Sequence, residues 1–357
     1  MTSSADPIST VSQRLERFAL DRRAEVADLG AEAADFVDRA LTAVAGGKRL
    51  RARFLSAGHA AAGAPSGDAD IAGVAASLEI FHAAALVHDD LVDNSDTRRG
   101  RPAAHRALEE AHRRSGWLGD ADAFGRAAAI LLGDLLIAWS DDLLEDALDG
   151  HPHAADVRRQ YATMRRDVTV GQYLDVAEEA AWATAPDGEH AARALRVASY
   201  KSARYSVQQP LLIGAALSGA TAAQRETLAD FGHAVGLAFQ LRDDVLGVFG
   251  DSSVTGKPSG DDLREGKRTV LIAYAREAMD DAGRSDLDAA LGDRTLDEAT
   301  IARLQKVIRE SGAVERLEGE IDRLSTAADT ALENAPIGAA EVALLREIAD
   351  AAIRRSA

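Results

Sequence analysis

Apolar residues recur along most of this chain at the three- and four-residue spacing of an α-helix. Alternation of β-branched or aromatic residues is almost absent, and aromatic residues make up only 4% of the chain, which argues against a sheet-rich fold. The pattern therefore predicts an all-α protein, a single large helical bundle. The expected helices span residues 11–43, 48–62, 70–95, 121–147, 154–180, 189–219, 221–249, 267–282, 297–311, 313–333 and 339–355.

Proline and glycine mark the ends of these helices. Most of the eight prolines lie in polar or glycine-containing stretches, and loops are expected at residues 63–68, 150–153, 185–188 and 252–260. Pro210 directly precedes an apolar run, so it either starts or kinks a helix. Residues 1–10 are expected to be disordered. No long linker and no internal repeat is found, so residues 11–357 are expected to form one domain.

Composition narrows the functional classes. With 58 acidic and 41 basic residues the net charge is −17, which disfavours a nucleic-acid partner. The lack of cysteine excludes disulfides and thiolate metal sites, and it fits a cytoplasmic protein. No signal peptide is visible in the first twenty residues. The longest apolar runs, at residues 130–132 and 211–217, are far shorter than a membrane span.

The run Asp-Asp-Leu-Val-Asp at residues 89–93 is the first candidate for chemistry. On a helix, Asp89 and Asp93 lie one turn apart on the same face and repel each other. A bound Mg²⁺ would reverse that repulsion, since carboxylates and substrate phosphates are its usual ligands. By itself the run fits a solvated helix end equally well, because acidic pairs such as Asp141 and Asp142 are common in this chain.

The neighbours of this run favour a binding site. Residues 78–87 are almost wholly apolar, which predicts a buried helix that leads into the charged end. His82 lies two turns before Asp89 on the same helix face. The run Arg-Arg-Gly-Arg at residues 98–101 follows, and guanidinium groups match the oxygens of phosphates. A ligand that carries phosphates is therefore indicated.

Taken together, Glu79-x-x-His82, the acidic run at 89–93 and Arg-Arg-Gly-Arg-Pro at 98–102 resemble the first aspartate-rich region of the trans-isoprenyl diphosphate synthases, or polyprenyl synthetases. The resemblance implies an isoprenoid synthase bundle with a central cavity, built around a prenyltransferase site. Such an enzyme joins isopentenyl diphosphate to an allylic diphosphate (dimethylallyl, geranyl or farnesyl) with Mg²⁺. A homodimer is expected by the same analogy.

Further segments extend the resemblance over nearly the whole chain. Gly-Gly-Lys-Arg-Leu-Arg at 46–51 is similar to the family's segment for isopentenyl diphosphate, and a helix that opens with a cationic first turn is suited to an anion. A solvated helix start is the plainer alternative for it. The other matching segments are Gly-Gln-x-x-Asp at 171–175, Tyr-Lys-Ser at 200–202, Phe-Gln-Leu-Arg-Asp-Asp at 239–244 and the glycine- and lysine-containing stretch at 255–269.

Residue by residue, the resemblance assigns three sets of roles. The metal ligands would be Asp89, Asp93 and Asp243, with three Mg²⁺ ions per site when substrate is bound and Mn²⁺ as the substitute ion. The catalytic residues would be Asp89, Asp90, Asp93, Lys201, Asp243, Asp244 and Lys257. The substrate-binding residues would be Lys48, Arg51, His82, Arg98, Arg99, Lys201, Ser202, Gln240, Lys257 and Lys267. One departure from the family pattern is Gly247, where a third aspartate is usual; Asp251 lies a turn beyond.

The helix before Asp89 is expected to set the length of the product. In the family, bulky residues four and five positions before the first aspartate stop elongation at about the farnesyl stage, and here these are Ala85 and Ala84. Phe81 lies roughly one further turn away, about 5.4 Å, close to one isoprene unit. This predicts geranylgeranyl diphosphate (C20) as the product, although Phe81 is equally suited to ordinary core packing.

Three alternatives remain open at the level of sequence. The product could be farnesyl diphosphate or a chain of C25 and above. A class I terpene cyclase has the same fold, but it needs no second substrate and so no counterparts of Lys48, Arg51, His82 and Arg99. A non-catalytic helical subunit should have lost site residues, and only Gly247 points that way.

Overall fold

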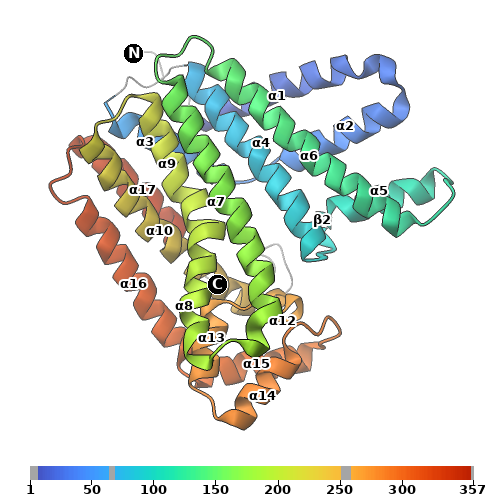
Figure 1. The fold of residues 1–357 in the computed structure, drawn as a ribbon, viewed down its shortest axis with the longest axis vertical. Coiled ribbons are helices and arrows are strands. Elements are labelled where there is room, and N and C mark those ends of the chain that lie inside the picture. The colour runs from blue at the N-terminus through green and yellow to red at the C-terminus, as the bar shows by residue number, and fades with distance from the viewer. Residues whose placement is uncertain (1–6, 64–68, 251–258, 355–357) are drawn as a thin grey trace. The chain divides into compact units, whose positions relative to one another are not determined.

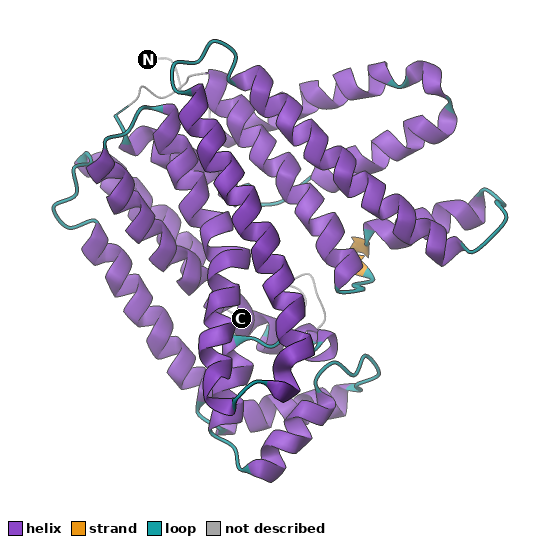
Figure 2. Ribbon diagram, in the orientation of Figure 1, coloured by secondary structure: helices purple, strands orange, loops and turns teal. Residues whose placement is uncertain are grey.

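The computed structural model describes residues 7–63, 69–250 and 259–354 (Figure 1). Helices make up almost all of this described part (Figure 2). The strands described are β1 (Thr97–Arg98) and β2 (Arg101–Pro102), which pair antiparallel as one short hairpin. The all-α prediction is confirmed.

The chain divides into two compact units. The N-terminal unit comprises residues 1–56 and 64–154, and the C-terminal unit comprises residues 57–63 and 155–357. The boundary passes through one helix, α3 (Leu50–Ala61). A single domain over 11–357 therefore stays a prediction, and each unit is described by itself.

The N-terminal unit contains two places where the helix predictions need correction. The helix predicted for 11–43 is divided at Gly30, whose φ of 97° lies outside the helical region. A short helix at residues 104–114 was not predicted. The elements are α1 (Pro7–Glu25), the 3₁₀ turn η1 (Ala27–Leu29), α2 (Ala31–Val44), the start of α3, α4 (Ala69–Val92), the hairpin, α5 (Ala104–Arg114) and α6 (Ala121–Ala147).

Helix α4 is the core of the N-terminal unit. Val74, Leu78 and Ile80 are at most 1% exposed, and α4 packs along α6 and against α1, α2 and α5 (Figure 1). The segment Ile71–Val92 is long and apolar enough to cross a membrane by length and composition, but 72% of its apolar window is buried inside the protein. The apolar residues of α4 are therefore core residues of a folded protein. The acidic residues lie at the C-terminal end of this helix.

The C-terminal unit agrees with the predicted helices except at three points. The stretch predicted as one helix at 189–219 contains a π-helical segment, η4, and Pro210 starts the α-helix that follows. Two helices near residues 261 and 281 were not predicted as such. The elements are α7 (Ala154–Ala181), η2 (Trp182–Thr184), η3 (Asp187–Glu189), α8 (His190–Val197), η4 (Ala198–Gln208), α9 (Gln209–Leu217), α10 (Ala222–Phe249), α12 (Asp261–Glu265), α13 (Val270–Glu277), α14 (Asp281–Ala290), α15 (Glu298–Glu310), α16 (Ala313–Ala331) and α17 (Ala339–Ile353).

Two glycines let neighbouring helices touch the backbone of η4. A Cβ atom at Gly171 of α7 would overlap the backbone of Lys201, and one at Gly236 of α10 would overlap the backbone of Ala203. Any larger residue at either position would push the helices apart. π-Helical turns are uncommon and are frequent at functional sites, and this one carries Lys201 and Ser202.

Candidate active site

The first acidic cluster lies at the C-terminal end of α4. The backbone amide of Asp93 donates to the carbonyl of Asp89 over 2.8 Å, so the helical turn continues through the cluster and Asp89 and Asp93 share a face. Asp90 lies off this face and is only 2% exposed. The structure therefore separates the three carboxylates into a pair on one face and a single buried group.

Arg98 of β1 holds the buried carboxylate. Its Nε donates to Oδ1 of Asp90 over 2.8 Å, its Nη2 donates to the same oxygen, and Nη2 also lies 3.5 Å from Oδ2 of Asp89. A guanidinium fork on a carboxylate is a strong, directional contact. The sequence suggested Arg98 only as a substrate-binding residue, a role that stays a prediction. The structure adds that Arg98 offsets the charge of the acidic cluster.

The β1–β2 turn places Arg99 against the glycine pair. Arg99 and Gly100 have φ angles of 53° and 71°, and the tight turn directs Nη1 of Arg99 to the carbonyl of Ala45 at 3.1 Å. A Cβ atom on Gly47 would lie 2.9 Å from Nη2 of Arg99. Gly47 is thus required both for its own φ of 87° and for the space that Arg99 occupies.

Cationic side chains gather around His82. Burial holds the pKa of His82 well below its usual range, and Arg51, Arg99, Arg98 and Arg49 lower it further. The lowered pKa keeps His82 neutral at physiological pH, and the charges of the four arginines act on it. Lys48 is exposed on the adjoining segment. The N-terminal unit thus brings together the residues predicted to bind isopentenyl diphosphate, in a cluster that favours a polyanion.

The residues predicted to limit the product lie on α4 before Asp89. Phe81 is 6% exposed, and Ala84 is fully buried. Ala85 is half-buried. This arrangement is compatible with a floor at Phe81 and equally with core packing, so the chain-length role stays a prediction.

The second acidic cluster ends α10. Asp244 is 4% exposed and accepts a hydrogen bond of 2.8 Å from Nε2 of Gln240. Burial raises the pKa of Asp244 to about 8, the hydrogen bond from Gln240 opposes this, and the carboxylates of Asp262 and Asp243 add to the rise. Gln240, predicted to bind substrate, therefore acts within the protein as the partner of Asp244.

The space at Gly247 is taken by a carboxylate from another helix. A Cβ atom at Gly247 would overlap the side chain of Asp262, which lies in the first turn of α12. The negative charge of Asp262 also raises the pKa of Asp244, more than the charge of Asp243 does. The space beside Gly247 is thus occupied by Asp262, which lies in the matching stretch at 255–269 and for which the sequence predicts no role. Asp251 and Lys257 lie outside the described residues.

The remaining predicted lysines each have a carboxylate partner. Nζ of Lys201 lies 2.5 Å from Oδ2 of Asp175, and Nζ of Lys267 lies 2.9 Å from Oε2 of Glu265. Asp175 belongs to the Gly-Gln-x-x-Asp motif, so the structure explains that motif: Gly171 allows α7 to approach η4, and Asp175 then meets Lys201. Ser202 is half-buried beside Lys201 on η4.

The donor set fits Mg²⁺ as a partner of bound diphosphate. The described residues contain no group of three His, Asp or Glu side chains already arranged to hold a metal ion. Mg²⁺ is usually held by one or two carboxylates together with waters and substrate phosphates. The paired Asp89 and Asp93 of the N-terminal unit are oxygen ligands of this kind, and so, within the C-terminal unit, is Asp243.

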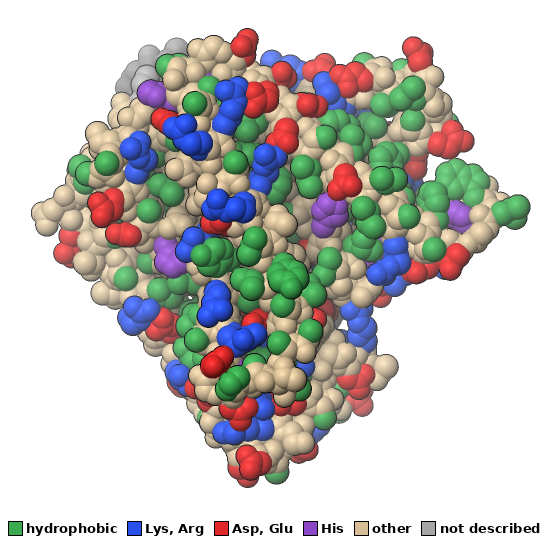
Figure 3. Space-filling view, viewed as in Figure 1, with side chains coloured by type: hydrophobic (Ala, Val, Ile, Leu, Met, Phe, Trp, Pro, Cys, Tyr) green, Lys and Arg blue, Asp and Glu red, His purple; other side chains and the backbone are tan. Residues whose placement is uncertain are grey.

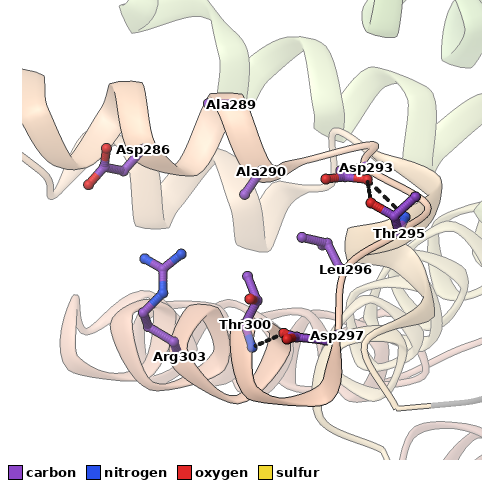
Figure 4. Close-up of a pocket in the computed structure, with 9 residues that line it drawn as sticks. All are labelled: Asp286, Ala289, Ala290, Asp293, Thr295, Leu296, Asp297, Thr300 and Arg303. Atoms are coloured by element: carbon purple, nitrogen blue, oxygen red, sulfur yellow. Dashed lines mark hydrogen bonds between the residues drawn. The ribbon is translucent and has the colours of Figure 1, made fainter.

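A separate pocket lies in the C-terminal unit between α14 and α15 (Figure 4). It has a volume of about 490 Å³ and contains none of the predicted site residues. Two of its acids serve the local backbone: Asp297 accepts from the amide of Thr300 at 2.8 Å, and Asp293 accepts from Thr295. These contacts explain the acids as helix and turn caps.

Comparison with known proteins decides the family. A model of the polyprenyl synthetase family matches residues 35–308. The chain belongs to this family. It is 31% identical to the geranylfarnesyl diphosphate synthase of Aeropyrum pernix over 277 residues, which cover 77% of this chain and 79% of the relative. It is 34% identical to the geranylgeranyl diphosphate synthase of Mycobacterium tuberculosis, over 69% of this chain and 63% of the relative.

Solved structures agree with this assignment. A geranylgeranyl pyrophosphate synthase from Corynebacterium glutamicum, complexed with isoprenyl diphosphate and magnesium, is 36% identical to this polyprenyl synthetase and superposes with a TM-score of 0.93. The match covers 99% of this chain and all of that one. The predictions of the fold and of an isoprenyl diphosphate synthase, a trans-prenyltransferase, are confirmed.

The raised pKa of Asp244 predicts a pH dependence of stability. The folded state keeps this proton up to about pH 8, whereas an unfolded aspartate releases it near pH 4. The stability that the group contributes is therefore complete below about pH 4 and is lost as the pH rises to about 8, at up to about 1.4 kcal/mol per pH unit. Denaturant unfolding in EDTA at pH 6, 7 and 8 should show this decline. The decline should be smaller in Asp244→Asn, and equal slopes for the two proteins would contradict the prediction.

Proposed function

We propose that this polyprenyl synthetase elongates an allylic diphosphate with isopentenyl diphosphate and that its main product is geranylgeranyl diphosphate (C20). The observation that carries the proposal is the cationic cluster in the same unit as the first acidic cluster: Arg99 lies against the glycine pair, and the charges of four arginines act on His82. A cyclase of one diphosphate substrate has no use for this second, metal-free anion site. The names of relatives, which include geranylgeranyl diphosphate synthases, support the product.

The residues divide the work between the two substrates. Lys48, Arg51, His82 and Arg99 would bind the diphosphate of isopentenyl diphosphate, and Lys201, Ser202, Lys257 and Lys267 would bind that of the allylic substrate. Asp89, Asp93 and Asp243 would hold Mg²⁺, with three ions per site when substrate is bound and Mn²⁺ as a substitute. When bound, Mg²⁺ stabilises the charge that develops on the leaving diphosphate.

The proposed chemistry is a head-to-tail condensation. The allylic C–O bond breaks, and its electron pair leaves with the diphosphate, whose charge the lysines neutralise. The double bond of isopentenyl diphosphate then attacks the allylic cation and forms the new C–C bond. A proton is lost from the adjacent carbon, and the departing diphosphate is the proposed acceptor. The buried apolar residues of α4 that precede Asp89 would help to keep water from the cation.

Radiolabelled isopentenyl diphosphate with each allylic primer provides the test. We expect Mg²⁺-dependent incorporation with a C20 product from the C5, C10 and C15 primers, each tested separately. A main product of C15, or of C25 and above, would overturn the product assignment but not the reaction. Hydrocarbon from geranylgeranyl diphosphate alone would instead indicate a cyclase, and a purified protein with no condensation would favour a non-catalytic subunit.

Phe81 is proposed as the floor of the product cavity, because the smaller Ala84 and Ala85 lie between it and Asp89. Phe81→Ala should lengthen the main product by at least one isoprene unit, since roughly 5.4 Å of helix is then opened. Chain length is measured by chromatography of the dephosphorylated products. Phe231→Ala removes another buried phenyl group, on α10, and should leave the product at C20. An unchanged product in Phe81→Ala would assign Phe81 to core packing.

A homodimer is proposed through an apolar patch at the end of α4 and the middle of α6. Val92, Ile130 and Leu131 are 48%, 48% and 61% exposed, and His88 lies 3.3 Å from the carbonyl of Ile130 between them. Figure 3 shows hydrophobic side chains along this exposed part of α6. Exposed patches of this kind mark protein interfaces.

The dimer is tested by substitution within the patch. Leu131→Asp should give a monomer in light scattering coupled to gel filtration, because the charge would be buried without a partner. Leu344→Asp, on α17 and outside the patch, should keep the dimer. A wild-type monomer, or a dimeric Leu131→Asp variant, would refute this interface.

The proposal also covers nucleic-acid partners, the location in the cell and the membrane. No nucleic acid partner is expected of a chain with a net charge of −17, and the lack of cysteine supports a cytoplasmic location. The burial of α4 supports the absence of a membrane span.

A further inference from the structure

Glu79 is a buried acid in the cationic cluster, and the reaction described above gives it no role. It lies on α4 one turn before His82 and is 5% exposed. Buried carboxylates are rare unless they are paired, because the loss of hydration is costly. Glu79 has two partners, and both belong to the segment that begins α3.

The first partner is the helix start itself. The amide of Arg53 donates to the carbonyl of Arg49, so Arg49 is the residue that precedes the first turn of α3. A residue at this position usually offers a side-chain oxygen to the amides of the first turn, but arginine has only donors. Oε1 of Glu79 supplies the missing acceptor from α4 and takes the amide of Ala52 at 3.2 Å. The carboxylate also lies at the favourable end of the helix dipole.

The second partner is the side chain of Arg49. Its Nη1 donates to Oε2 of Glu79 over 3.2 Å, and the two side chains are 11% and 5% exposed. Arg49 has a φ of 51°, which is unusual for a residue other than glycine. Both the ion pair and the cap thus hold the backbone at the point where the chain turns from the glycine pair into α3. Lys48 and Arg51 lie on either side of that point.

Glu79 also opposes the repulsion within the cluster. Partial burial, Arg49 and Arg98 lower the pKa of Arg99, and Glu79 is the carboxylate that raises it. Because Arg98 is paired with Asp90, the single charge of Glu79 is set against Arg49, Arg51 and Arg99, which leaves an excess of positive charge for a ligand. The same group can therefore fix the geometry of the cluster without neutralising it.

We propose that Glu79 is a positioning residue for isopentenyl diphosphate, which caps α3 and anchors Arg49 so that Lys48 and Arg51 are held in place to receive the diphosphate. The inference rests on the proposed function, since it assigns the cationic cluster to this substrate. It gives Glu79 no contact with the reacting atoms.

The direction in which the KM for isopentenyl diphosphate changes distinguishes a positioning residue from a simple counter-ion. Glu79→Gln keeps an oxygen for the amide of Ala52 but removes the negative charge. If Glu79 were only a counter-ion, the more positive cluster would bind isopentenyl diphosphate more tightly. Positioning predicts the reverse: the KM for isopentenyl diphosphate should rise roughly tenfold, at the lower end of the range typical for groups that orient a ligand-binding side chain. Glu79→Ala, which also removes the cap, should raise it further.

The allylic substrate provides an internal comparison. Its KM should stay within about twofold of the wild-type value in Glu79→Gln, because that substrate is assigned to other residues. Glu109→Gln is the matched control: Glu109 is a 6% exposed acid of the same unit, paired with Arg106 and Arg113. Both KM values should be unchanged in this variant. An unchanged or lower KM for isopentenyl diphosphate in Glu79→Gln overturns the proposal, and so does an equal rise for both substrates.

Binding of inorganic diphosphate, followed by calorimetry in EDTA, distinguishes failure of this inference from failure of the proposed function. EDTA removes the metal ions that the allylic site requires, so binding reports on the cationic cluster. We expect Kd to be roughly tenfold higher in Glu79→Gln than in the wild type. If the wild type makes no prenyl product but shows this difference, the reaction is wrong and the role of Glu79 in anion binding stands. Equal Kd values reject that role.

Discussion

Repulsion between like charges held close together is the constraint on which the site of this polyprenyl synthetase depends. A diphosphate needs several positive charges, and each Mg²⁺ needs one or two carboxylates, yet neither set of like charges is stable by itself inside a protein. In this structure, each group of like charges has a partner of opposite charge or a neutral hydrogen-bond donor beside it. Glu79 lies among the arginines, Arg98 holds the first acidic cluster, and Gln240 donates to Asp244. Each partner offsets part of the charge and leaves the rest for a ligand.

These partners belong to neighbouring elements, so they reach the charged residues only because the helices pack closely. The first acidic cluster can end α4 because the rest of that helix is buried against α6, α1 and α2. The pair between Lys201 and Asp175 exists because Gly171 brings α7 against the backbone of η4. The turn at Arg99 and Gly100 returns an arginine to the glycine pair. Small residues and tight turns thus fix where the charges meet.

Local sequence predicts most of the helices and places the first acidic run at a helix end. Helix α6 was predicted with its observed bounds, because Asp120 caps its first turn and its apolar spacing is regular. The split at Gly30 was missed, since glycine alone does not say whether a helix continues. Pairings across elements, such as Asp90 with Arg98, depend on a turn whose direction no spacing rule supplies. The roles of the site residues stay predictions, and their partners in neighbouring elements could not be predicted.

In the second acidic cluster, the motif has no carboxylate at position 247, but a carboxylate from another helix lies beside that position. A carboxylate at position 247 would lie one turn from Asp243 on α10 and would add to the repulsion there. Glycine at 247 instead exposes bare backbone, and the carboxylate of Asp262 from α12 occupies that space. Asp262 lies in the first turn of α12, where a helix favours negative charge. The acids that act on Asp244 therefore come from two helices, Asp243 from α10 and Asp262 from α12. The packing of α12 against α10 sets which carboxylates face one another, and a motif compared position by position does not reveal this.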